Sequence, residues 1–352
     1  MSAPAATPAV AAPAGEPTAV TPAPLLAVQG ARKLFALKAA GRLLPWGRAA
    51  RTPMLHAVDG VDLTIGHGES VGLVGESGCG KSTLVRLITR TLDPTSGTLR
   101  FLGEDIAGIA ARDFARAPQR KLIQMVFQDP TDSLNPRYAA RDTIAEPLRL
   151  LAGLSGAELD ARVNEVADQV QLPRALLARY PHQLSGGQKA RVGIARAIAL
   201  SPRLLILDEP TAALDVSVQA VILHLLADLK EQLGMSYLFV SHDLNIVRLL
   251  CDRVLVMYLG RIVESGPAQQ VFASPRHPYT RALLSAIPGL GGAAGQRIRL
   301  EGDPVSPIDP DPHRCRFHGR CPKGRDECTR SAPQLAELAP GHSVACLFPE
   351  SA

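Results

Sequence analysis

A glycine-rich segment between an apolar run and a helix-forming run constrains the fold of this chain more than any other feature. Residues 75–82 read GESGCGKS and match the pattern G-x-x-x-x-G-K-[S/T]. The apolar run at 69–74 predicts a strand before the segment, and the run from Lys81 predicts a helix after it. Such a loop places backbone N–H groups around phosphates at a helix start. The segment therefore predicts an α/β fold that binds a nucleoside triphosphate.

The side chains of this segment have separate expected roles. The Lys81 ammonium reaches the β- and γ-phosphates, and the Ser82 hydroxyl coordinates Mg²⁺. Cys79 has two interpretations: a thiolate favoured by Lys81 and the helix start, or a small side chain that the loop tolerates. The residues expected to contact the nucleotide phosphates are Gly75, Ser77, Gly78, Cys79, Gly80, Lys81, Ser82 and Thr83.

A second motif lies far along the chain, after another apolar run. Residues 204–207 read LLIL, which predicts a buried strand, and Asp208 and Glu209 follow directly. We expect Asp208 to join Ser82 in the Mg²⁺ shell and Glu209 to accept a proton from the attacking water. A strand that happens to end in acids is the alternative, and the upstream glycine-rich segment makes it less attractive.

The rest of the chain alternates between strand and helix patterns. This alternation predicts a doubly wound α/β sheet, and 46% hydrophobic with 20% charged residues fits a globular protein of that class. Amphipathic stretches within 142–180 interrupt the alternation and predict a helical subdomain at about 131–183. Strands are expected at 25–35, 55–65, 69–74, 121–127, 204–207, 236–240 and 253–257, and helices from Lys81, after Leu214 and after Asp243.

Composition and patterning exclude some classes of protein. No run reaches the roughly 18 apolar residues of a membrane-spanning helix, and the N-terminus lacks the basic start and apolar run of a secretory signal. We expect a cytoplasmic chain whose residues 1–24 form a disordered Ala- and Pro-rich tail.

A net charge of +5 does not by itself argue for nucleic acid. The insertion at 36–54 is expected to be a loop, with basic residues that are solvated or, alternatively, near lipid headgroups: Lys38, Arg42, Arg48 and Arg51.

A third motif narrows the class of nucleotide-binding protein. Residues 184–188 read LSGGQ and precede the helical run KARVGIARAIAL. Together with the two motifs above, this segment resembles the ABC ATPase family. The resemblance implies a parallel sheet flanked by helices, antiparallel β and helical subdomains, and two ATP molecules bound between two such subunits. It also implies contacts with the γ-phosphate of ATP held by the opposite subunit, made by Ser185, Gly186, Gly187 and Gln188.

The remaining positions of the family pattern are also filled. By the same resemblance, Gln128 in MVFQDP senses Mg²⁺ and the water, and Asp215 in AALD occupies the D-loop position. His242 in FVSHD would hold the γ-phosphate and Glu209 in place, although a lone histidine at a strand end would carry no such meaning. Phe35 stands where the family usually has an aromatic that stacks on adenine; a core phenylalanine on a strand is the alternative.

The resemblance continues beyond the ATPase core, from 25 to 348, and becomes more specific there. Residues 275–284, PRHPYTRALL, and 314–322, RCRFHGRCP, are similar to the ATP-binding subunits of dipeptide and oligopeptide importers. This likeness implies an ATP-binding domain at 25–272 and a Cys-rich extension at 273–352. It further implies a peripheral subunit on the cytoplasmic face of the membrane, using ATP and Mg²⁺. Its partners would be a second ABC ATPase, two permeases and, indirectly, an extracytoplasmic substrate-binding protein, with no nucleic acid.

Alternative functions remain open at this point. Relatives also carry nickel, opines or sugar derivatives, and the ATPase core does not distinguish import from export. A soluble ABC ATPase acting on nucleic acid or ribosomes is a different class. Such proteins usually fuse two ATPase units or contain a long coiled coil, and this sequence has neither.

Four cysteines gather near the C-terminal part of the sequence. Cys315, Cys321, Cys328 and Cys346 follow the spacing C-x5-C-x6-C-x17-C, which lacks the short C-x2-C pairs typical of structural zinc. Four thiolates suit a [4Fe-4S] cluster, and some relatives carry one there. The alternatives are zinc, or cysteines without a metal. The further zinc ligands considered are His313, His318 and His342.

Overall fold

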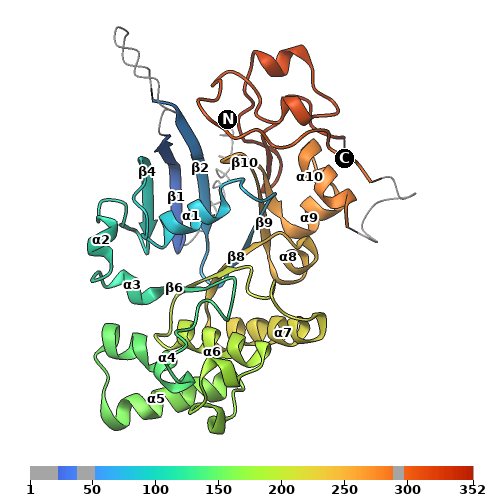
Figure 1. Ribbon diagram of the computed structural model, residues 1–352. Helices are drawn as coiled ribbons and strands as arrows, with labels where there is room; N and C mark the ends of the chain where they lie inside the picture. The colour runs from blue at the N-terminus through green and yellow to red at the C-terminus, as the bar shows by residue number, and fades with distance from the viewer. Residues whose placement is uncertain (1–22, 38–51, 288–296, 352) are drawn as a thin grey trace, which may run out of the picture.

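The computed structural model describes residues 23–37, 52–287 and 297–351, and Figure 1 shows their arrangement. Most of the predicted N-terminal tail and the centre of the 36–54 insertion, including its four basic residues, lie outside the described residues. Within these ranges, none of the helices combines the length and the apolar character that a membrane crossing requires.

An eight-stranded sheet forms the centre of the molecule, in the order β11-β12-β10-β9-β3-β8-β7-β6. Its five strands from β9 to β6 are parallel, and their apolar residues are buried on both faces, as expected for a parallel sheet covered by helices. The doubly wound α/β prediction is therefore confirmed. The parallel strands are β3 (Ser70–Val74), β6 (Ile123–Val126), β7 (Leu204–Asp208), β8 (Ser236–Ser241) and β9 (Arg253–Tyr258).

Helices follow the parallel strands along the chain. Helix α1 (Lys81–Ile88) follows β3, α7 (Val216–Leu233) follows β7, and α8 (Leu244–Leu250) follows β8. Because each helix starts where a strand ends, the loops that precede the helices meet at the carboxyl edge of the sheet.

A second, antiparallel sheet packs beside the first, in the order β2-β1-β4-β5 (Figure 1). Of its strands, the sequence patterns predicted the two long ones, and the short pair β4 and β5 was missed. The predicted strand at 121–127 starts later than expected, because residues 119–122 form the short helix α3. The elements are β1 (Leu26–Ala36), β2 (Met54–Ile65), β4 (Ser96–Phe101), β5 (Glu104–Asp105), α2 (Ala111–Phe114) and α3 (Gln119–Leu122).

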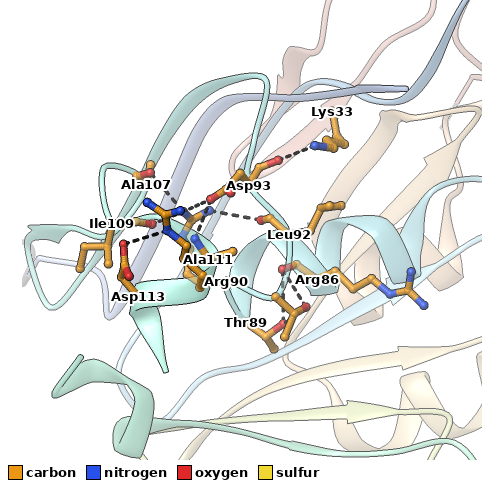
Figure 2. Close-up of polar contacts among 12 residues, drawn as sticks. Lys33, Arg86, Thr89, Arg90, Leu92, Asp93, Ala107, Ile109, Ala111 and Asp113 are labelled. Carbon is orange, nitrogen blue, oxygen red and sulfur yellow. Dashed lines mark hydrogen bonds and ion pairs between the residues drawn. The ribbon is translucent and has the colours of Figure 1, made fainter. Parts of the chain in front are cut away.

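A buried arginine joins the end of α1 to the antiparallel sheet (Figure 2). The Arg90 side chain is fully buried, and its guanidinium donates to Asp93 Oδ1 at 2.8 Å and to the Ala107 carbonyl at 3.2 Å. It also donates to the carbonyls of Leu92 and Ile109. A buried charge is tolerated only with such partners. Arg90 therefore fixes the helix that follows β3 against the region around β5.

The helical block predicted within 142–180 is present and lies below the sheets in Figure 1. Apolar residues such as Ile144, Val163 and Ile194 pack into one core cluster there. The predicted limits of 131 and 183 stay a prediction. The elements are α4 (Ala140–Pro147), a π-helical turn (Leu148–Ala152), α5 (Gly156–Gln169), two short turns (Arg174–Leu176 and Pro181–Gln183) and α6 (Gly186–Ile198).

Residues 297–351, here called the C-terminal segment, follow α9 and α10 and form little regular structure. Strand β12 pairs with β10, with Glu264 opposite Val344, so the segment extends the main sheet. Figure 1 shows this red part of the chain beside β10 and α10. The predicted boundary at 273 stays a prediction. The elements that precede the C-terminal segment are β10 (Arg261–Pro267), α9 (Ala268–Ala273) and α10 (Pro278–Ser285). Those within it are two turns (His318–Arg320 and Asp326–Thr329), β11 (Ala336–Ala339) and β12 (His342–Val344).

Candidate functional site

A large cavity of about 670 Å³ opens at the carboxyl edge of the parallel strands. It is called the strand-end cavity below. Residues from the loops after β3, β6, β7 and β8 contribute to its walls, together with residues of β1 and β2. The sequence-predicted residues that line it are Phe35, Ser77, Gly78, Gly80, Lys81, Ser82, Thr83, Gln128, Asp208, Glu209 and His242.

The loop at 75–80 has a backbone that other residues could not adopt. Gly80 has φ +112°, and a Cβ atom there would lie 2.3 Å from the Ala57 carbonyl oxygen. At Gly75 a Cβ atom would lie 2.2 Å from the Met257 carbonyl oxygen. The glycines at these positions are therefore required by close approach of neighbouring backbone.

The Lys81 side chain is buried against this loop. Its Nζ donates to the carbonyl oxygens of Gly75 at 2.7 Å and Glu76 at 3.0 Å. Burial raises the pKa of the Cys79 thiol, and this effect outweighs the nearby charge of Lys81. Burial therefore favours the protonated thiol and the second interpretation of Cys79, a small buried side chain, although Lys81 Nζ lies 3.8 Å from its Sγ.

One carboxylate brings together side chains from three loops. Gln128 Nε2 donates to Glu209 Oε2 at 2.9 Å, and His242 Nδ1 lies 3.0 Å from Glu209 Oε1. Glu209 itself has φ +47°, an uncommon value for a residue with a Cβ, and its backbone N–H donates to the Val240 carbonyl. Strained backbone of this kind is often found at functional sites. These contacts fix the carboxylate at the cavity wall.

The predicted Mg²⁺ ligands line the same cavity. Ser82 follows Lys81 in α1, and Asp208 ends β7 beside Glu209. Burial and the neighbouring Glu209 charge raise the pKa of Asp208, so a cation would be favoured there. Hydroxyl, carboxylate and amide oxygens are the donors that Mg²⁺ prefers, and the residues present fit that ion.

The LSGGQ segment lies at the start of α6. Ser185 Oγ accepts from Gln188 N at 3.3 Å, and Gln188 Oε1 accepts from Ser185 N at 3.0 Å, which makes a reciprocal cap. A Cβ atom on Gly187 would lie 2.7 Å from Val218 Cγ1. Ser185 and Gly186 are exposed, as is Asp215 before α7. Among the described residues that line the strand-end cavity, none belongs to 184–188 or is Asp215.

Phe35 lies on β1 at the edge of the strand-end cavity. It is half-buried, pairs with Leu55 of β2, and has the Lys33 ammonium 5.2 Å from its ring centre. Three residues that the sequence patterns missed line the cavity close by: Pro304, Ser306 and Pro307. They belong to a stretch, EGDPVSPID, that carries no periodicity or motif, so no signal in the sequence pointed to them.

The four cysteines line one small cavity together with His318. Burial raises the pKa of the Cys346 thiol to about 11 and raises those of Cys315 and Cys321 as well. Over the described ranges, no group of three or more His, Cys, Asp or Glu side chains has an arrangement that holds a metal ion. The expected metal site is therefore not supported.

Of the other histidines considered as ligands, His342 is engaged elsewhere. Its Nε2 lies 2.8 Å from Glu264 Oε1, and both side chains are buried. His313 is exposed and does not line the cysteine cavity. The structure thus leaves His318 alone among the three beside the cysteines.

The fold, the glycine-rich loop and the capped LSGGQ helix define an ATPase of the ABC class. Residues 58–212 match the family model described as ABC transporter, and residues 263–328 match the one described as the C-terminal region of oligopeptide/dipeptide transporters. The chain belongs to the family of ATP-binding subunits of oligopeptide and dipeptide ABC transporters. As an ABC ATPase of this family it hydrolyses ATP.

Relatives and solved structures agree with this membership. The oligopeptide transport ATP-binding protein AppF of Bacillus subtilis is 46% identical, covering 82% of this chain and 88% of that protein. The dipeptide transport ATP-binding protein DppF of Haemophilus influenzae is 42% identical over 92% and 96%. The dimeric ATP-binding cassette MJ0796 bound to ADP and Pi is similar in structure, with a TM-score of 0.59, 28% identity, and coverage of 69% and 98%.

Proposed function

We propose that the chain binds Mg-ATP in the strand-end cavity and that its hydrolysis drives import of peptides through membrane permeases. The observation that carries this proposal is the convergence of Gln128 and His242 on Glu209, beside Lys81. Membership in the peptide-transporter family supports peptides over nickel, opines or sugar derivatives as cargo, and it supports a transporter over a nucleic-acid factor.

Each residue at the cavity has a proposed role. Glu209 accepts a proton from the attacking water, while Gln128 and His242 orient its carboxylate. Lys81 and the loop N–H groups bind the phosphates. Ser82, Gln128 and Asp208 would hold Mg²⁺, which neutralises charge on the phosphate oxygens when bound.

A second ATPase subunit is proposed to complete each site. The start of α6 is exposed and lies apart from the strand-end cavity of its own chain. A capped helix start with free N–H groups is suited to an anion, so Ser185 and the amides of Gly186 and Gly187 are assigned to the γ-phosphate held by the other subunit. ATP that contacts both subunits only in the closed dimer would favour closure.

The experiment is reconstitution of the chain with its second ATPase and two permeases in vesicles. ATP hydrolysis should rise when a peptide-loaded binding protein is added on the outer side, and Lys81→Ala should remove the hydrolysis contributed by this chain. Stimulation by a nickel, opine or sugar ligand in place of peptide would overturn the cargo assignment. Hydrolysis unaffected by Lys81→Ala would overturn the nucleotide site.

A thiolate-ligated group at the four cysteines is a separate proposal, with a [4Fe-4S] cluster preferred to zinc. All four thiols line one cavity. Over the described ranges they are not arranged to hold a metal ion, so binding would require the four side chains to move closer together. Two measurements test it: iron and sulfide content after anaerobic purification, and zinc content of the same sample. About four iron atoms per chain would support the cluster, and a protein with neither metal would remove the proposal.

A further inference from the structure

Part of the C-terminal segment runs along the edge of β2 at the strand-end cavity. Ile308 forms an antiparallel bridge with Leu55. His56 N donates to the Pro307 carbonyl at 2.9 Å, and Asp309 N donates to the Met54 carbonyl at 2.9 Å. Because β2 is the outer strand of its sheet, this stretch occupies an edge that would otherwise be open. Backbone hydrogen bonds therefore fix its position.

This stretch also forms part of the lining of the strand-end cavity. Pro304, Ser306 and Pro307 line the cavity, although Pro304 and Ser306 are also exposed to solvent. Val305 between them is 79% exposed and does not line the cavity. Leu55 pairs with Phe35 of β1 on one side and bridges Ile308 on the other. The stretch thus lies at the same end of the cavity as Phe35.

A second contact links the C-terminal segment to the glycine-rich loop. The Arg320 guanidinium binds the Glu76 carboxylate through two hydrogen bonds, of 2.6 Å and 3.1 Å. Arg320 Nε also donates to the Gly302 carbonyl at 3.1 Å. The Arg320 side chain is 10% exposed and the Glu76 side chain 29%, so the pair is partly shielded from solvent. Two-point pairs of this kind fix orientation as well as distance.

The backbone of the same loop residue has a partner from α10. Glu76 N donates to Tyr279 Oη at 2.8 Å, and Tyr279 is fully buried. Glu76 is therefore held by its side chain and by its backbone, in both cases by residues that follow 272. It occupies a variable position of the G-x-x-x-x-G-K-[S/T] pattern, so the motif alone assigns it no role.

We propose that the C-terminal segment completes the nucleotide site within its own subunit. Pro304, Ser306 and Pro307 contact the nucleoside end of bound ATP, and Arg320 is a positioning residue that holds the phosphate-binding loop through Glu76. This inference rests on the proposed binding of ATP in the strand-end cavity.

The contact of Pro304, Ser306 and Pro307 with ATP, here called the wall contact, is tested with a matched pair of variants in the full chain. Ser306→Trp places a bulky ring in the cavity, while Val305→Trp places it in solvent one residue away. The Kd for ATP should rise about tenfold in the first variant and change less than twofold in the second. Equal Kd values in Ser306→Trp and the wild type would overturn the wall contact. A wild-type chain that binds no ATP would instead overturn the proposed function.

The positioning role is tested with Arg320→Met and a control, Arg330→Met, at an exposed arginine of the same segment. In Arg320→Met, the KM for ATP should rise about five- to tenfold while kcat changes less. Glu76→Gln should have a similar effect, and the double variant should add little to either. A lower Tm with unchanged KM in Arg320→Met would reduce Arg320 to a structural residue and overturn the role.

Discussion

At the residue scale, the chemistry depends on how Glu209 is held. Its backbone lies in the left-handed region, and its carboxylate is fixed between Gln128 and His242. An amide in place of this carboxylate would keep the size of the side chain and lose the ability to accept a proton.

Glu209→Gln should therefore separate binding from hydrolysis. We expect ATP turnover to fall by about a hundredfold or more, because the base is lost, while the Kd for ATP stays near the wild-type value. Turnover is measured by phosphate release and binding by titration with ATP. Normal turnover in the variant would show that Glu209 is not the base.

The glycines of the loop allow a second residue-scale prediction. In Gly80→Ala, the new Cβ meets the Ala57 carbonyl at 2.3 Å, so ATP binding should be lost and the free energy of unfolding lowered by about 2–4 kcal/mol. Gly78→Ala is the control, because Gly78 also has positive φ but has open space around it. Gly78→Ala should lower the free energy of unfolding by about 1–2 kcal/mol. Thermal or chemical unfolding measures both values, and an equal loss of unfolding free energy in Gly80→Ala and Gly78→Ala would contradict this prediction.

Short motifs made the residues of the strand-end cavity predictable, because each role depends on a fixed local spacing. Lys81, Asp208 and Glu209 all line the cavity as their patterns suggested. Arg320 and Ser306 could not be predicted, since their importance arises from distant backbone contacts that no local spacing records.

At the scale of single elements, helix α10 depends on a buried histidine. His277 Nδ1 accepts from Tyr279 N at 3.1 Å and so caps the helix. Its backbone N–H donates to Glu264 Oε2 at 2.9 Å. Burial lowers the pKa of His277 to about 3, which keeps the ring neutral in the folded chain.

This histidine should make stability depend on pH in a defined window. Below the ordinary pKa of 6.5 the unfolded chain gains a proton that the folded chain does not, so stability falls as the pH drops from 6.5 toward 3. Between pH 7 and pH 5 the loss from this group is about 2 kcal/mol. Chemical unfolding at several pH values measures it.

The matched variant is His277→Asn, which keeps a cap acceptor without a titrating ring. Its unfolding free energy should vary less with pH between 6.5 and 5 than that of the wild type. His67→Asn, at an exposed histidine, should retain the wild-type slope. An unchanged slope in His277→Asn would refute the assignment to this residue.

Elements with long or continuous apolar patterns were predictable, and short ones were not. Strands β3, β7 and β8 are buried on both faces, which leaves a clear apolar run in the sequence. Strands β5 and β12 have two and three residues and depend on pairing with neighbours. Such elements carry too few residues for a pattern to form.

At the scale of the whole molecule, the proposed sites lie between two subunits. A dimer would need Lys81 from one subunit and Ser185 from the other for each ATP. A subunit that lacks Lys81 still supplies Ser185, and a subunit that lacks Ser185 still supplies Lys81. A mixed dimer of the two defective subunits therefore has one complete site.

A mixing experiment tests this arrangement where the chain pairs with itself. Lys81→Ala and Ser185→Arg should each abolish turnover alone. Their equal mixture should recover about a quarter of wild-type activity, because half the dimers are mixed and each has one complete site. No recovery, with dimers confirmed by mass, would contradict the shared sites. Activity of Ser185→Arg alone would do the same.

The edge contact between residues 304–309 and β2 also affects the order in which the molecule matures during synthesis. Chains fold from the N-terminal end as they leave the ribosome. The glycine-rich loop at 75–82 emerges early, but its Glu76 anchor at Arg320 and the Ser306 wall emerge much later. If the C-terminal segment completes the nucleotide site as proposed, a nascent chain would carry an incomplete, weakly binding site until residue 320 has emerged from the ribosome, which delays capture of ATP to a late stage of synthesis.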